Sequence, residues 1–146
     1  MSAFLLDVNV LVALAWPGHQ AHQRAQRWFA RRASKGWATC PMTEAGFVRI
    51  VSNRAFSPRA VTPGEAVRAL RITISHARHQ FWKDDISLAD ALSASQAKLF
   101  GHKQITDAYL LGLAIHKRGI LATFDQGIRS LAGPGVDVPG YLELIV

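Results

Sequence analysis

Near its start the chain reads Phe4-Leu5-Leu6-Asp7-Val8-Asn9-Val10-Leu11, and this stretch sets the expectation for the whole fold. Residues 3–6 form an apolar run too short for a helix, so they predict a buried strand that ends at Asp7. Asn9 then precedes the apolar residues 10–15, which predict a short helix ended by a Pro-Gly pair. A buried strand followed at once by a helix is the opening of a parallel α/β unit.

The same alternation of strands and helices continues along the chain. Further short apolar strands are expected at residues 37–40, 80–82, 120–123 and 136–138. Helices are expected at 19–35, 43–52, from 62, at 87–99, 107–118 and from 125. Because the strands are apolar on both faces, they favour a parallel sheet covered on both sides. We therefore predict an α/β protein with a three-layer α/β/α fold, in which a central, mainly parallel sheet of about five short strands belongs to a single domain, residues 1–146.

Composition limits the class of protein. Of the 146 residues, 49% are hydrophobic and 18% are charged, which excludes an intrinsically disordered chain. Cys40 is the only cysteine, so an internal disulfide and a cysteine-rich zinc site are both excluded. The 17 Lys and Arg against 10 Asp and Glu give a net charge of +7. This charge favours a polyanionic partner, with nucleic acid ahead of an anionic membrane.

No targeting or membrane segment is expected. The apolar stretch 3–16 is interrupted by Asp7 and Asn9 and follows no basic residue, unlike a signal peptide. No other apolar stretch reaches the ~18 residues that span a bilayer. We therefore expect a cytoplasmic protein with no membrane partner.

Four of the ten acidic residues lie at the end of an expected strand or the start of an expected helix: Asp7, Glu44, Asp107 and Asp125. In a parallel α/β sheet these ends meet at one edge, where ligands bind, so the four are expected to converge. The alternative for each is helix capping, worth roughly 0.3–1 kcal/mol. Capping is favoured for any one of these residues considered by itself, and Asp125, with a short helix behind it, is an example. Capping is less expected for Glu44, because Thr43 is placed to cap its helix. Thr106 stands in the same relation to Asp107.

Clustered carboxylates need a compensating positive charge, because each raises the pKa of its neighbours. A divalent cation supplies that charge, and Mg²⁺ prefers oxygen ligands and keeps several of its waters. Such a site can activate a water molecule and stabilise a phosphate during reaction. An acidic metal site on a basic protein therefore suggests phosphodiester hydrolysis.

The four acids stand in the strings Phe4-Leu5-Leu6-Asp7-Val8-Asn9-Val10-Leu11, Thr43-Glu44-Ala45-Gly46-Phe47, Thr106-Asp107-Ala108-Tyr109-Leu110 and Ala122-Thr123-Phe124-Asp125. In their order and spacing these strings resemble the motifs of the PIN-domain ribonucleases, and within that family a VapC-type toxin of a bacterial type II toxin–antitoxin system. The similarity covers nearly the whole chain. It implies that the same four acids bind Mg²⁺ or Mn²⁺ for the hydrolysis of RNA. It also implies a homodimer and a cognate antitoxin protein whose C-terminal segment covers the active site.

The leading hypothesis is a Mg²⁺-dependent endoribonuclease that acts as a toxin on an RNA substrate. The metal would be held mainly by Asp7, Asp107 and Asp125 and would activate a water molecule. Glu44 would complete the metal shell or assist proton transfer. One alternative is a non-catalytic PIN-like module that binds RNA or a partner. A small phosphatase with Asp7 as nucleophile ranks last, because Asn9 stands where that chemistry usually has a second acid.

Several other residues carry weaker expectations. Asn9 is weighed evenly between orienting substrate or water and capping the first helix, and Thr106 is a further candidate for contact with substrate or with the metal ligands. Trp16 is a candidate for a partner groove, whereas core packing is favoured for Trp28. The six histidines form no recognisable ligand set. One helical stripe either contacts RNA phosphates or is an ordinary solvated face: Arg24, Arg27, Arg31 and Lys35.

Overall fold

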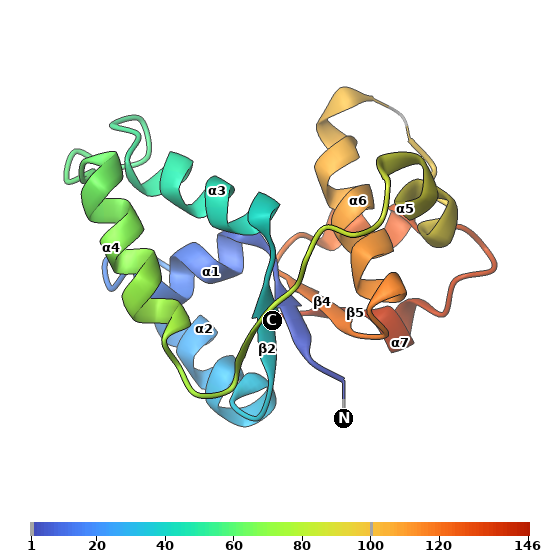
Figure 1. Ribbon diagram of the computed structural model, residues 1–146, viewed down its shortest axis with the longest axis horizontal. Helices are drawn as coiled ribbons and strands as arrows, with labels where there is room; N and C mark the ends of the chain where they lie inside the picture. The colour runs from blue at the N-terminus through green and yellow to red at the C-terminus, as the bar shows by residue number, and fades with distance from the viewer. Residues whose placement is uncertain (1, 100) are drawn as a thin grey trace.

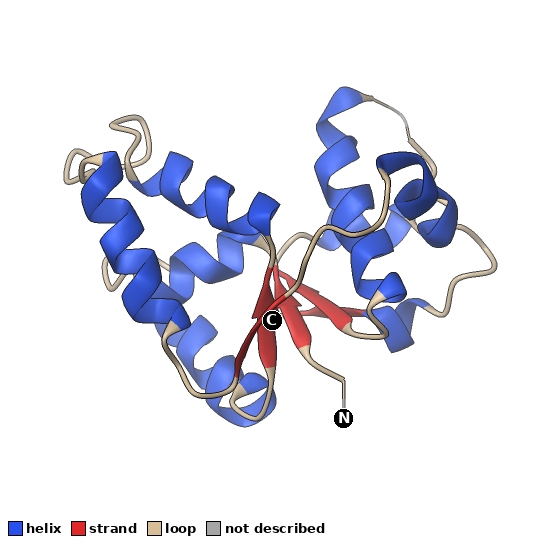
Figure 2. Ribbon diagram, in the orientation of Figure 1, coloured by secondary structure: helices blue, strands red, loops and turns tan. Residues whose placement is uncertain are grey.

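The computed structural model describes residues 2–99 and 101–146, which form a five-stranded sheet between two groups of helices (Figure 1 and Figure 2). The strands are β1 (Phe4–Leu6), β2 (Trp37–Thr39), β3 (His79–Phe81), β4 (Ile120–Thr123) and β5 (Leu142–Leu144). Their order across the sheet is β3-β2-β1-β4-β5, and every neighbouring pair is parallel. The predicted three-layer α/β/α fold is confirmed.

The two helical layers come from the two halves of the chain. The layer on the left of Figure 1 contains α1 (Val8–Ala15), α2 (His22–Trp28), α3 (Pro41–Val51) and α4 (Pro63–Ile74). The layer on the right contains α5 (Leu88–Ser95), α6 (Ile105–His116) and the short α7 (Val138–Tyr141). Shorter helical segments are the π-helix η1 (Phe29–Ala33) and the 3-10 helices η2 (His102–Gln104) and η3 (Gln126–Leu131). Among the described residues, no helix is both long enough and apolar enough to cross a lipid bilayer.

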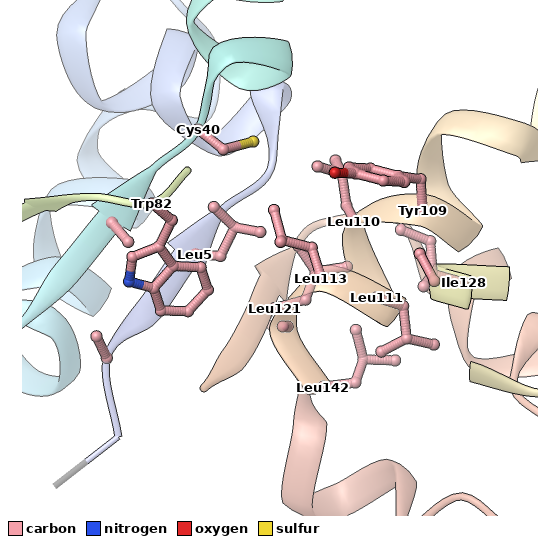
Figure 3. Close-up of a cluster of buried hydrophobic side chains, with 14 of the residues drawn as sticks. Leu5, Cys40, Trp82, Tyr109, Leu110, Leu111, Leu113, Leu121, Ile128 and Leu142 are labelled. Carbon is pink, nitrogen blue, oxygen red and sulfur yellow. The ribbon is translucent and has the colours of Figure 1, made fainter. Parts of the chain in front are cut away.

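Each face of the sheet has its own hydrophobic core. Phe4 and Leu6 belong to a buried cluster that includes Phe47 of α3. Leu5, between them, belongs to a second cluster that includes Leu113 of α6, shown in Figure 3. Successive side chains of a strand point to opposite faces. The central strand β1 is therefore apolar along its whole length, and the first polar residue at its carboxyl end is Asp7.

The predicted position of the fifth strand, residues 136–138, is wrong. The strand lies at Leu142–Leu144, where Leu142 is buried against β4. The preceding residues form α7 instead, with Pro139 in its first turn. Proline lacks the backbone N–H that a strand needs for pairing, whereas the first turn of a helix does not use that group.

The single helix predicted at residues 19–35 is interrupted. α2 ends at Trp28 and the chain continues as the π-helix η1. A π-helix has i→i+5 hydrogen bonds and is wider than an α-helix. Trp28 and Ala33, five residues apart at the two ends of this turn, are both buried. The indole N–H of Trp28 also donates a hydrogen bond to Glu143, whose carboxylate forms an ion pair of 2.6 Å with Arg32. The helical layer is thereby tied to the edge strand β5.

Candidate active site

The hydroxyl of Thr123 joins two of the predicted site residues. β4 ends at this fully buried threonine, whose Oγ1 donates a hydrogen bond of 2.7 Å to Asp7 Oδ2. The same oxygen accepts a hydrogen bond of 3.0 Å from the backbone N–H of Asp125. Because β1 and β4 are parallel neighbours, Thr123 holds the end of one strand against the loop that follows the other.

Asp7 is buried and also forms the N-cap of α1. The residue is 6% exposed, and its Oδ1 accepts a hydrogen bond of 2.8 Å from the backbone N–H of Val8. Burial raises the pKa of Asp7, its two hydrogen bonds oppose that rise, and the charge of Asp125 adds to it. Of the two roles weighed for Asn9, capping of this helix is excluded, because Asp7 occupies the cap and Asn9 lies exposed in the first turn.

Asp107 lies in the first turn of α6, within electrostatic reach of the other two aspartates. Burial, followed by the negative charges of Asp7 and Asp125, raises the pKa of Asp107 from 3.8 to about 6. The structure therefore brings three of the four predicted acids together at the carboxyl edge of the sheet. In the protein alone, one of them is partly protonated near neutral pH.

Glu44, the fourth acid, is held by a different strand. It lies in the first turn of α3, and its Oε2 accepts a hydrogen bond of 2.6 Å from Oγ1 of the fully buried Thr39. Oγ1 of Thr39 also lies 2.7 Å from Nε2 of His79. A hydroxyl has one proton, so with Glu44 as its acceptor Thr39 receives the hydrogen bond from His79. Burial lowers the pKa of His79, and the charge of Glu44 opposes that shift.

The two threonines predicted to cap the helices of Glu44 and Asp107 do not do so. α3 begins at its proline, two residues before Thr43, and Thr43 Oγ1 accepts a hydrogen bond of 3.0 Å from the N–H of Cys40. α6 begins at Ile105, so Thr106 lies exposed in the first turn rather than at the cap. Local sequence places helix starts only to within a few residues. The expectation that threonine caps make a capping role less expected for Glu44 and Asp107 therefore has no support in the structure.

Asp125 does act as a cap, as favoured when it is considered alone. Its Oδ1 accepts a hydrogen bond of 2.8 Å from the backbone N–H of Gly127 and caps η3. An ionised carboxylate offers about four lone-pair sites. Capping by Asp7 and Asp125 therefore leaves each carboxylate able to accept further partners.

The oxygen donors at this edge suit a divalent cation, although they do not form a complete coordination site. Within residues 2–99 and 101–146, no group of three His, Cys, Asp or Glu side chains is arranged to hold a metal ion. The groups that perturb Asp107 are negatively charged carboxylates, and their mutual repulsion is what a cation relieves. Mg²⁺ takes only one or two carboxylates from a protein and keeps several waters. The residues thus fit such an ion in charge and donor type.

Three residues that orient these acids were not found from the sequence: Thr39, His79 and Thr123. Both threonines end buried strands, Thr39 five residues before Glu44 and Thr123 two residues before Asp125, which is a signal that a search of strand ends could use. The role of His79 depends on the pairing of β3 with β2, in which it lies opposite Trp37. No local pattern in the sequence predicts which residues of these two strands lie opposite each other.

The predicted basic stripe is exposed, and one end of it approaches the acidic edge. Arg24 lies over the ring of Phe124, 4.6 Å from the ring centroid, and Phe124 directly precedes Asp125. The other three members are exposed as well: Arg27, Arg31 and Lys35. Of the two tryptophans considered above, Trp28 is buried as favoured, whereas Trp16 is partly exposed.

Comparison with known proteins identifies the family. The PIN domain family matches residues 4–134. Ribonuclease VapC38 of Mycobacterium tuberculosis (strain ATCC 25618 / H37Rv) is 47% identical over 143 residues, covering 97% of this chain and 99% of the relative. Ribonuclease VapC39 of the same strain is 45% identical over 132 residues, covering 90% and 95%. The chain belongs to the PIN-domain family, and these curated relatives within it are VapC ribonucleases.

Solved structures share the fold at low sequence identity. Mycobacterium tuberculosis VapC20, described as a sarcin-ricin loop cleaving toxin, superposes with a TM-score of 0.65 at 15% identity, covering 88% of this chain and 94% of that one. A chain of Rickettsia felis VapBC2, bound to a fragment of promoter DNA, gives a TM-score of 0.62 at 14% identity and covers 97% and 98%. Both confirm the arrangement of sheet and helices.

Proposed function

We propose that this protein is a Mg²⁺-dependent endoribonuclease, with Mn²⁺ as an alternative ion, that acts as the toxin of a toxin–antitoxin pair. The observation that carries the proposal is the group of Asp7, Asp107 and Asp125 at the carboxyl edge of the sheet, where their charges act on one another. The membership of the chain in a family whose curated members are ribonucleases supports RNA as the substrate.

Each acid has a distinct part in the proposed reaction. Asp7 is fixed through both carboxylate oxygens by Thr123 and the start of α1, so it offers rigid ligand positions. Asp107 and Asp125 complete the oxygen donors for the ion. The bound ion would supply positive charge for the phosphate and acidify the attacking water.

Glu44 would assist proton transfer or complete the metal shell, and its setting favours the first role. Its carboxylate is oriented by Thr39, and a general base must lie within hydrogen-bonding reach of the proton it accepts. Asn9 and Thr106 are both exposed in first helical turns beside the acids, which supports a role for them in contacting substrate.

The proposal includes partners. Structural neighbours come from VapBC complexes, including one from Salmonella typhimurium bound to DNA, which supports a cognate antitoxin protein for this chain. A homodimer is also proposed, and the exposed apolar side chains Ile72 and Phe81 support a further protein contact. A toxin that cleaves the RNA of its own cell works in the cytoplasm.

Cleavage of a mixed RNA substrate by the purified protein tests the proposal. We expect cleavage in Mg²⁺, none in excess chelator, and none by the variants Asp7→Asn, Asp107→Asn and Asp125→Asn. Expression of the wild type should arrest growth, and co-expression of an adjacent small reading frame should restore it. Undiminished cleavage by these variants, or in chelator, overturns the assignment. RNA binding without any cleavage would favour a non-catalytic module.

A further inference from the structure

The net positive charge of the protein comes from one part of the chain. Residues 8–64 contain eight of the 17 Lys and Arg but one of the ten acidic residues, Glu44. The rest of the chain contains nine of each, so its net charge is zero. This basic segment runs from α1 to the start of α4 and forms the left side of the molecule in Figure 1. A polyanion is therefore attracted to this layer, and the acidic edge lies at its border.

Two adjoining hollows lie on this basic layer, between the loop 16–21 that joins α1 to α2 and the loop 52–62 that joins α3 to α4. Their volumes are about 480 Å³ and 330 Å³, in the range of small-ligand pockets. Trp16 lines both hollows, together with Gly18 and Ser57. Its indole meets the ring of Phe56 edge to face, at 5.8 Å between centroids and 73°. We call the two hollows together the Trp16 groove.

The Trp16 groove also carries a free positive charge. Arg59 lines the larger hollow and is exposed, and Arg54 is exposed on the same loop. Within the part of the chain that the structure describes, neither guanidinium forms an ion pair. Among the described residues that line the two hollows, none is acidic. An aromatic surface beside an unpaired arginine suits a base and its phosphate.

A short route leads from the Trp16 groove to the acidic edge. His19 lines the smaller hollow, and its backbone carbonyl accepts a hydrogen bond of 3.0 Å from the N–H of His22, the first residue of α2, the helix that carries Arg24. Arg24 in turn covers Phe124, beside Asp125. α1, which has eight residues, separates Trp16 from Asp7, and a helix of that length rises about 12 Å.

We propose that the Trp16 groove binds unpaired nucleotides of single-stranded RNA next to the cleaved bond, with a base stacked on Trp16 and a phosphate on Arg59. This inference rests on the proposed ribonuclease function and names the form of RNA that the site accepts. Duplex RNA hides its bases within the stack, so only a single-stranded segment can offer one to an aromatic side chain. Arg24 would hold the phosphate backbone between the groove and the acids.

The test measures RNA binding in chelator, so that affinity is separated from cleavage. Labelled oligonucleotides of about 12 nucleotides, single-stranded or duplex, are titrated with the wild type and with Trp16→Ala, Trp16→Phe and Arg59→Gln. Trp16→Ala should weaken single-strand binding about 5- to 150-fold, the range for loss of one stacked base. It should leave duplex binding unchanged, and Trp16→Phe should retain most of the affinity.

Arg59→Gln gives a second readout that does not depend on the packing of Trp16. The slope of log affinity against log salt should fall by about one unit when a phosphate contact is lost. Arg71→Gln is the matched control, because Arg71 is exposed on α4 and lies outside the basic segment. This control should keep the affinity for single strands and the salt slope of the wild type.

Three results would overturn the inference. The first is unchanged single-strand affinity in both Trp16→Ala and Arg59→Gln. The second is equal loss of single-strand and duplex binding in Trp16→Ala. The third is loss of binding to a co-expressed antitoxin in Trp16→Ala with RNA binding intact, which would make the groove a protein site. If the groove variants lose RNA binding but the wild type cleaves no RNA, the ribonuclease proposal fails and the groove proposal stands. If the wild type cleaves RNA and the groove variants bind RNA as the wild type does, the groove proposal fails and the ribonuclease proposal stands.

Discussion

Replacing Asp107 by Asn should stabilise the metal-free protein at neutral pH. The folded protein raises the pKa of Asp107 from 3.8 to about 6, so between these values the native state binds more protons than the unfolded state. Stability contributed by the protonated form is full below about pH 4 and is lost as pH rises through about 6. A shift of this size corresponds to at most about 3 kcal/mol. Because the side chain is half-buried, solvent screening reduces the expected gain to about 1–2 kcal/mol.

Urea denaturation in excess chelator measures this effect. Asp107→Asn should unfold at higher urea than the wild type near pH 7.5, and the difference should nearly vanish near pH 4, where the wild-type carboxyl is protonated. Mg²⁺ should then stabilise the wild type but not the variant, because only the native wild type binds the ion. Asp84→Asn, at an exposed acid, is the control and should show neither change. Equal stability of wild type and Asp107→Asn at both pH values would refute this electrostatic reasoning.

The residues that support the site and the packing of the second layer give further predictions. Thr123→Val removes the hydroxyl bonded to Asp7 and should cost about 1–3 kcal/mol in the free energy of unfolding, measured by urea denaturation, and should slow RNA cleavage. Thr39→Val should slow cleavage by releasing Glu44, whereas Thr39→Ser, which keeps the hydroxyl, should restore the rate in the same assay. Gly112→Ala would drive a methyl group into the backbone of α5 and should lower the melting temperature, at a cost of about 1–3 kcal/mol or more.

The fold could be predicted because its signals are local. The run at residues 3–6 is apolar at every position, as a strand covered on both faces must be, and the strands around residues 37–40 and 120–123 repeat that pattern. The fifth strand was misplaced because Val136 and Val138 look strand-like, whereas Pro139 favours a helical first turn. Burial of Leu142 depends on its partner strand, which the local sequence does not reveal.

The acids of the site could be predicted for a related reason. Each stands where a strand ends or a helix begins, and parallel topology brings such positions to one edge. What local sequence does not contain is how side chains turn after the strands pair. Thr123 reaches Asp7 across 116 residues of chain, and His79 reaches Thr39 across 40. These contacts, and the different setting of Glu44, follow from strand register rather than from spacing.

A calorimetric titration of Mn²⁺ into the chelator-treated protein near pH 6 tests the central claim most directly. If the three aspartates hold the ion, the wild type should bind it saturably and release protons, because Asp107 must lose its proton to become a ligand. Asp107→Asn should bind far more weakly and without that proton release, while the control Asp84→Asn should match the wild type. Saturable binding of equal strength by Asp107→Asn, or no binding by the wild type, would contradict the account.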